Sequence, residues 1–172
     1  MRRLSLNART ALDADATDEI YVVLLRFTHP SLDKPVFLST DPTERLSIEP
    51  LMYGTYSSWL NLDGEPFLFI LASTMVPDDK EDAPAAATVI LETVDKDMAT
   101  VLRSIKDRAT VDMAVVLASS TDVIEAEWTG LRLMVANGNA SEITLQISRE
   151  SIYEEPFPYG RMTRARFPGL HM

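Results

Sequence analysis

Residues 110–148 read TVDMAVVLASSTDVIEAEWTGLRLMVANGNASEITLQIS, and their pattern decides the fold. Apolar and polar side chains alternate in short runs, which is typical of strands with one buried face. The alternation predicts four strands, at Thr110–Leu117, Val123–Trp128, Leu131–Val135 and Glu142–Ser148. Because these strands follow one another without helices between them, we predict a mainly antiparallel sheet.

A turn signal lies between the last two of these strands. Asn137-Gly138 suits the tight turn of a hairpin, because asparagine and glycine tolerate the positive φ angles that such a turn needs. We therefore expect the last two strands to form a hairpin, with Ile143, Leu145 and Ile147 pointing into the core.

The sequence before residue 110 predicts further strands and two helices. Residues Ser5–Ala14 form a short amphipathic pattern, and the strand Glu19–Phe27 that follows has apolar side chains on both faces. A second helix is predicted after Asp95, a suitable N-cap, because apolar residues recur at helical spacing through Ile105. Further strands are expected at Val36–Leu38, Leu51–Tyr56, Phe67–Ile70 and Thr88–Val94, and a turn at Asp41–Arg45.

These elements come in runs of strands rather than in strand–helix–strand alternation. We therefore predict a mainly β (α+β) fold: an antiparallel β-barrel or sandwich with an N-terminal helix, one packed helix and an extended C-terminal arm. Residues 1–156 are assigned to the β-barrel domain and residues 157–172 to the arm. A parallel nucleotide-binding sheet is not expected.

The composition argues against several classes of protein. The formal net charge is −10, and an acidic surface repels the phosphates of nucleic acid. The chain has no cysteine, which excludes thiolate metal sites, and its 2 histidines make histidine-based catalysis unexpected. No apolar run approaches the length of a membrane helix and no secretory signal is recognisable, so we expect a product of the cytoplasm that does not insert into membranes.

The remaining candidates for chemistry have simpler explanations. The acidic run Asp78–Asp82 is interpreted as a solvated loop, because it lacks the spaced ligands of a calcium loop. Alternation places Glu125 and Glu127 on the solvent face of their strand. Trp59 and Trp128 suit core or interface packing, although either could stack on a sugar ring. We therefore expect no enzyme, no catalytic residue, and no cofactor or metal site.

The C-terminal residues differ in composition from the rest of the chain. From Phe157 onward there are three arginines and no acidic residue, and aromatic residues alternate with proline and glycine. Such a sequence suits an extended arm, which cannot bury its rings on itself. An acidic protein surface is the expected partner, and single-stranded nucleic acid is the alternative. The residues expected to make this interface are Phe157, Tyr159, Arg161, Arg164, Arg166 and Phe167.

Several features recur in a fixed order along the chain. They are the N-terminal helix leading into Glu19–Phe27, the aromatic segment Tyr53–Tyr56, the strand and helix start at Ala87–Asp95, and the last strand running on to Phe167-Pro168-Gly169. This order resembles the phage minor tail protein family of the lambda L type over almost the whole chain. Short prophage and siphophage tail proteins that end in an Arg-x-x-x-Phe-Pro-Gly-like sequence are similar in the segment Arg161–Gly169.

The resemblance departs from the family at one point. Longer lambda-type members continue past Phe-Pro-Gly into a cysteine-rich extension suited to an iron–sulfur cluster. This chain has no cysteine, so the cluster and any function tied to it are not expected here.

The resemblance implies a structural role in the virion. It implies a hub or adaptor subunit of the tail-tip (baseplate) ring, synthesised in the host cytoplasm, which links the tail tube to the central hub and fibres. The expected partners are its own copies in a ring and other tail proteins, with DNA passing through the lumen without specific binding. The alternatives are a distal tail ring protein, a carbohydrate- or receptor-binding module, a small hydrolase and an assembly chaperone.

Overall fold

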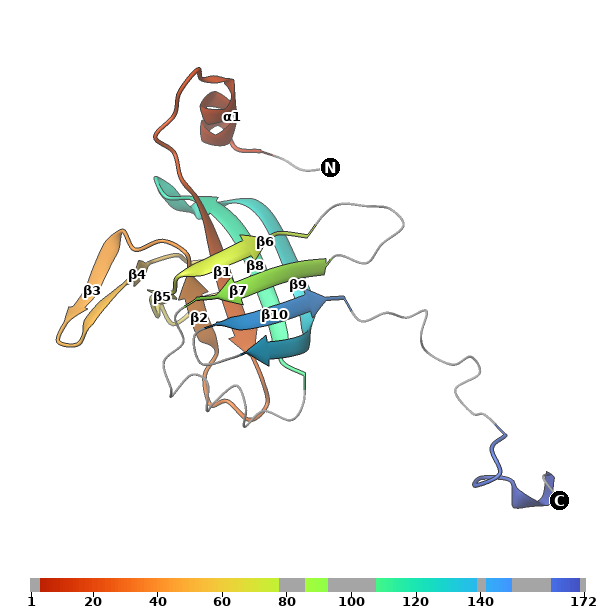
Figure 1. Ribbon diagram of the computed structural model, residues 1–172. Helices are drawn as coiled ribbons and strands as arrows, with labels where there is room; N and C mark the ends of the chain where they lie inside the picture. Colours follow the sequence, from red (N-terminus) through yellow and green to blue (C-terminus); the bar gives the residue numbers. More distant parts are fainter. Residues whose placement is uncertain (1–3, 78–85, 93–107, 139–141, 150–161, 171–172) are drawn as a thin grey trace.

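The chain folds into a curled sheet with one short helix beside it (Figure 1). A computed structural model describes residues 4–77, 86–92, 108–138, 142–149 and 162–170. Within them lie α1 (Leu6–Asp13) and ten strands: β1 (Tyr21–Thr28), β2 (Val36–Ser39), β3 (Glu44–Ile48), β4 (Leu51–Thr55), β5 (Phe67–Phe69), β6 (Ala72–Met75), β7 (Ala86–Leu91), β8 (Thr110–Leu117), β9 (Ser120–Gly138) and β10 (Ile143–Ser148). A 3-10 turn, η2, covers Pro168–Leu170.

The predicted fold class, mainly β with a helix, is confirmed. The strand order is β3-β4-β5-β2-β1-β8-β9-β10-β7-β6, so the sheet is open, and the parallel pair β2–β5 makes it mixed rather than purely antiparallel. Only Ile70 and Leu71 separate β5 from β6. Phe67–Met75 is therefore one continuous run of chain whose first strand, β5, pairs with β2 and whose second strand, β6, pairs with β7. The sheet curls so that β2 and β7 both reach this run.

Two apolar clusters lie on the two faces of the central strands. The larger cluster fills the inside of the curl, with side chains from β1, β2, β7, β8, β9 and β10. The smaller cluster lies on the other face of β1 and β8, where Trp59 and Phe67 cover Val22, Leu24 and Val116. The prediction that Glu19–Phe27 is buried on both faces is confirmed from Val22 onward, whereas Ile20 and Tyr21, which were also expected to be buried, are exposed.

The C-terminal half of the sheet differs from its prediction in one strand. The two strands predicted at Val123–Trp128 and Leu131–Val135 form one strand, β9, of 19 residues. Gly130 has a φ of 69° and lies at a shift of register, where Val111 pairs with Leu131 and Met113 with Trp128. The strand therefore continues through a bulge where the sequence suggested a break.

The predicted antiparallel pairing of the last two strands is confirmed, but Asn137, expected in the turn, belongs to β9 and pairs with Thr144. Gly138 still belongs to β9 and pairs with Ile143 of β10. Ile143, Leu145 and Ile147 are buried, as predicted.

Three other details differ from the predictions. Glu44 and Arg45, expected in a turn, begin β3, and the strand β6 was not predicted. The predicted strand at Thr88–Val94 forms as β7, which begins two residues earlier. The helix expected after Asp95 lies outside the described residues.

Candidate interaction surfaces

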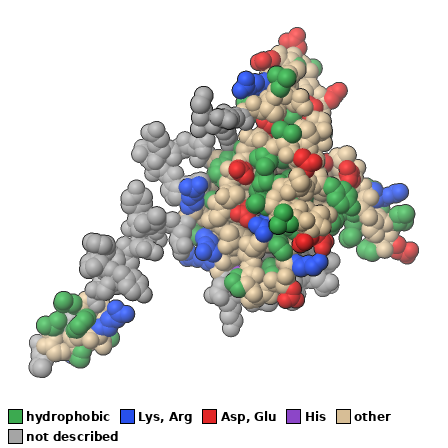
Figure 2. All heavy atoms as spheres, turned by 180° about the vertical axis from the view of Figure 1, so that it is seen from behind, with side chains coloured by type: hydrophobic (Ala, Val, Ile, Leu, Met, Phe, Trp, Pro, Cys, Tyr) green, Lys and Arg blue, Asp and Glu red, His purple; other side chains and the backbone are tan. Residues whose placement is uncertain are grey.

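The described part of the predicted arm is a small turn with every residue exposed. Within Met162–Leu170, the amides of Arg166 and Phe167 donate to the carbonyl of Thr163, and the amide of Leu170 donates to that of Phe167. Of the predicted interface residues, Arg164, Arg166 and Phe167 lie in this turn and are exposed. Figure 2 shows basic and apolar side chains together on it, without acidic ones. The other three, Phe157, Tyr159 and Arg161, lie outside the described residues.

The hairpin of β3 and β4 is a second projecting element (Figure 1). Only Gly54 and Thr55, at the end of β4, pair with β5, so the rest of the hairpin extends beyond the sheet. Gly54 permits this contact, because a Cβ added there would collide with the carbonyl oxygen of Phe67. Large apolar side chains cluster at and near the tip of this hairpin, where Ile48, Leu51, Met52 and Tyr53 are all exposed.

Buried polar groups fasten the base of this hairpin. The hydroxyl groups of Ser39 and Thr55 lie 3.0 Å apart, and the Thr55 hydroxyl also donates to Oδ2 of Asp41 at 3.2 Å. All three residues are buried. The base is therefore fixed while the apolar tip is exposed, which is the arrangement of an arm rather than of a core element. This projecting hairpin was not predicted from the sequence. The signal was the turn proline Pro50 between the apolar residues Ile48 and Leu51.

The helix α1 is the third projecting element. Ser5 is its N-cap, and its hydroxyl accepts from the amide of Ala8. The amide of Ser5 donates to Oε2 of Glu125 at 2.8 Å, and Ala8 is fully buried. Leu6 and Leu12, however, are 78 % and 61 % exposed, so the predicted amphipathic helix does not bury its leucines on its own chain.

The predicted position of Glu125 on the solvent face is wrong. Glu125 is buried, and in the register between β8 and β9 it is the extra residue of a bulge, since Val115 pairs with Ala126 and Val116 with Ile124. The bulge breaks the alternation and lets the carboxylate reach the start of α1. Glu127 is exposed, as predicted.

The two tryptophans are buried, at 5 % exposure for Trp59 and 7 % for Trp128. The loop that carries Trp59 is fastened to the start of β9: the hydroxyl of Ser57 donates to the carbonyl of Thr121, and the amide and hydroxyl of Ser58 donate to Asp122. The bond from the Ser58 amide, and to a smaller extent the bond from its hydroxyl, holds the pKa of Asp122 below its usual value. Neither indole ring is available for a sugar to stack on.

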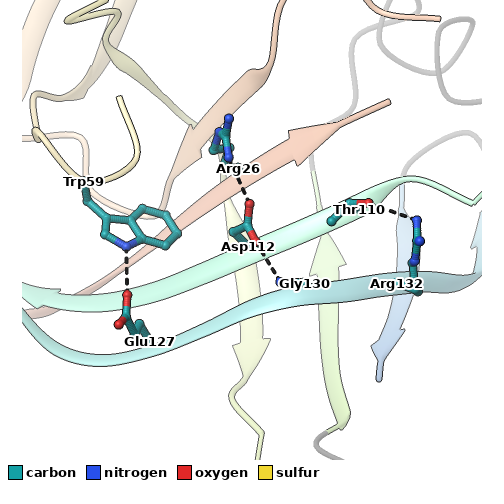
Figure 3. A network of polar contacts seen from close by, with 7 residues as sticks. All are labelled: Arg26, Trp59, Thr110, Asp112, Glu127, Gly130 and Arg132. Carbon is teal, nitrogen blue, oxygen red and sulfur yellow. Dashed lines mark hydrogen bonds and ion pairs between the residues drawn. The ribbon is translucent and has the colours of Figure 1, made fainter. Parts of the chain in front are cut away.

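A line of polar contacts crosses the sheet from Arg26 to the bulge of β9 (Figure 3). Asp112 is buried, and its Oδ2 accepts from Nη1 of Arg26 at 3.2 Å. Its Oδ1 accepts from the amide of Gly130 at 2.8 Å. Asp112 thus satisfies the backbone of the bulge and pairs with a cation, which is a structural use of a buried carboxylate. Arg132 donates to Thr110 in the same region.

This arrangement makes Asp112 a strong determinant of stability. Replacing it in Asp112→Ala should lower the free energy of unfolding by about 2–3 kcal/mol, because two bonds to a charged group are lost and Arg26 stays without its partner. Asp112→Asn should lose less, since its amide oxygen still accepts from the Gly130 amide. Urea unfolding of the three proteins measures both differences. Equal stability of the alanine variant and the parent chain would contradict this reading of the network.

No protein-family model and no curated protein matches the chain. Among the described residues, no three His, Asp or Glu side chains gather as a metal site would require, and no helix is both long and apolar enough to span a bilayer. His29 is buried, and its Nδ1 accepts from the amide of Ser31, as expected of a histidine in a turn. The surfaces that stand out are therefore the three projecting elements: α1, the β3–β4 hairpin and Met162–Leu170.

Proposed function

We propose that this chain is a structural, non-enzymatic subunit of a phage tail tip, which acts as a hub or adaptor in the baseplate ring between the tail tube and the central hub and fibres. The observation that carries the proposal is the contrast between a closely packed sheet and three extensions with exposed apolar residues. Ile48 of the hairpin, Leu6 of α1 and Leu170 of the C-terminal turn are 75 %, 78 % and 64 % exposed.

Exposed apolar clusters of this kind favour an assembly over a protein that acts alone. A single exposed leucine is ordinary, but groups of large apolar side chains on projecting elements are typical of interaction sites. A two-stranded hairpin gains little stability in isolation, so a hairpin with an apolar tip is best explained by a partner that covers it. Three such elements on one chain fit a subunit with neighbours on several sides.

The buried sheet supports the same proposal. β1 and β8 have apolar side chains packed on both faces, so the centre of the molecule is a stiff support for the extensions. Within the described residues, the buried carboxylates of Asp41, Asp112 and Glu125 bond to hydroxyl, amide or guanidinium groups of the chain itself. The resemblance to minor tail proteins of the lambda L type adds the kind of assembly: a ring at the tail tip, in a virion.

A distal tail ring protein is the nearest alternative, because it would use the same extensions between ring neighbours. A carbohydrate-binding module has less support, since both tryptophans that suggested it are buried.

Labelled tails test the proposal directly. Negative-stain microscopy of tails that carry a tagged copy of this chain should show the label at the tail tip, and the chain should be found in purified virions. A label elsewhere on the particle, or a chain that is missing from purified virions, would contradict the proposed role. Absence from virions would favour the assembly chaperone.

A further inference from the structure

The surface around α1 has apolar residues that its own chain leaves uncovered. Leu6 and Leu12 lie near the two ends of the helix, and Ile20, just before β1, is 62 % exposed. Ala8 and the amide of Ser5 meanwhile hold the helix against its own chain. The helix is therefore held in place with large apolar side chains left in solvent, which costs free energy unless a partner covers them.

The same surface is acidic on balance, although α1 itself also carries the exposed Arg9. Asp13, the last residue of α1, is followed by Asp15, Asp18 and Glu19 before Ile20, and no lysine or arginine lies between Asp13 and Ile20. Glu19 accepts from the hydroxyl of Ser119, whereas Asp13, Asp15 and Asp18 are exposed. We call Leu6, Leu12, Asp13, Asp15, Asp18 and Ile20 together the α1 surface. A partner for it should combine apolar side chains with positive charge.

The C-terminal turn has this composition. Met162–Leu170 carries Arg164 and Arg166 and no acidic residue. Its large apolar side chains, Met162, Phe167 and Leu170, are all exposed. Arginine and aromatic residues are also those that concentrate binding energy in protein interfaces. The turn and the α1 surface therefore complement each other in charge and in apolar character.

The α1 surface and the end of β10, from which the chain continues toward the C-terminal turn, lie at opposite ends of β8. Residues near the α1 surface meet the last residues of β8: Tyr21 pairs with Leu117, and the amide of Ala118 donates to the carbonyl of Ile20. The last residue of β10, Ser148, pairs with Arg132, which pairs with Thr110 at the start of β8. At about 3.3 Å per residue, these ends of β8 are about 23 Å apart. Successive copies placed head to tail can therefore bring turn and α1 surface together.

We propose that Met162–Leu170 of one copy binds the α1 surface of a second copy, with the arginines against the aspartates and the apolar side chains against Leu12 and Ile20. This rests on the proposed function and names the partner of the arm within the ring. A contact between two different patches of identical chains is heterologous, and a heterologous contact closes into a ring when the rotation between copies allows it.

Disulfide trapping tests the contact, because the chain has no cysteine of its own. Chains with Asp15→Cys are mixed with chains with Arg166→Cys under mild oxidation, and mixed dimers are counted on a non-reducing gel. We expect mixed dimers well above those obtained with Asp33→Cys in place of Asp15→Cys. Asp33 is an exposed carboxylate between β1 and β2, on the Thr110 side of the sheet. Equal yields with the two aspartate positions would overturn the proposal.

A chain with both substitutions distinguishes a contact within one chain from a contact between two copies. Asp15→Cys/Arg166→Cys at high dilution should stay reduced or form dimers. A monomer closed by an internal disulfide, with no mixed dimers in the first experiment, would mean that the arm binds its own chain and would overturn the proposal.

Charge reversal tests the arginines and aspartates. In the trapping assay, Arg164→Glu in the Arg166→Cys chain should slow dimer formation by about three- to tenfold at low salt, as should Asp18→Lys in the Asp15→Cys chain. Combining the two reversals should recover most of the rate. Slowing without recovery would overturn the assigned charge contact. If trapping fails while tails still contain the chain, only the second-copy partner is wrong, whereas absence from tails removes the proposed function itself.

Discussion

A chain that ends at Pro156 is expected to fold as the full chain does and yet to be missing from assembled tails. The described residues that it lacks, Met162–Leu170, are all exposed, and the three backbone hydrogen bonds identified there join residues of that turn to one another. Among the described residues, none beyond Ile147 belongs to either apolar cluster of the core. Removal of the arm should therefore change the midpoint of urea unfolding little, while incorporation into tails falls to background.

The measurement has two parts. Urea unfolding compares the stability of the shortened and full chains, and immunoblots of purified tails compare their incorporation. A full-length chain with Arg164→Ala, Arg166→Ala and Phe167→Ala is the matched control, because it keeps the length of the arm and removes the predicted contacts. It should also fail to assemble. A shortened chain that still enters complete tails would remove the arm from the assembly mechanism.

Phe67→Ala is expected to have the largest effect on stability of any single change considered. Phe67 of β5 is fully buried, its ring lies edge-on to Phe37 with centroids 4.9 Å apart, and it stacks on Trp59 at 6.3 Å. Truncation of a buried phenylalanine to alanine typically costs about 3–5 kcal/mol. This is a large part of the roughly 5–15 kcal/mol that stabilises an ordinary domain.

The effect of this change should extend beyond the cavity. β5 joins the β3–β4 hairpin to β2, and with β6 it forms the run that reaches from β2 to β7. We therefore expect Phe67→Ala to increase hydrogen exchange in β3 and β4 as well as to lower the unfolding midpoint. Leu68→Ala is the matched control: Leu68 is the next residue and 37 % exposed, so its loss should cost about 1 kcal/mol or less. Equal costs of the two changes would contradict the assigned packing.

The sheet was largely predictable because its strands alternate or are apolar throughout. β8 has the predicted bounds, and β1, β2, β7 and β10 lie within two or three residues of theirs. The period of two in a strand is local, so a short run of sequence suffices to reveal it. Strand order was not predictable to the same extent. The parallel pair β2–β5 depends on residues about thirty positions apart in the chain, which no local pattern records.

Two of the errors concern side chains whose burial differs from what their neighbours in the sequence suggest. Glu125 alternates with Ile124 and Ala126 as a solvent-facing residue would, but a bulge turns it toward the amide of Ser5. Leu6 and Leu12 of α1 and Leu51 of the β3–β4 hairpin are apolar, as core residues are, yet they are exposed. Apolar character shows that a side chain favours burial, and it does not show whether its own chain or another covers it.

By itself, the sequence determined that this protein is mainly β, where most strands lie, and that its C-terminal residues form a cationic and aromatic segment unlike the rest. Only the tertiary structure decided that β9 is one bulged strand, that both tryptophans are buried, and that apolar side chains of α1, the hairpin and the C-terminal turn are left in solvent. The reason is physical. Strand formation follows from the alternation of neighbouring residues, whereas burial depends on which distant residues arrive at the same place.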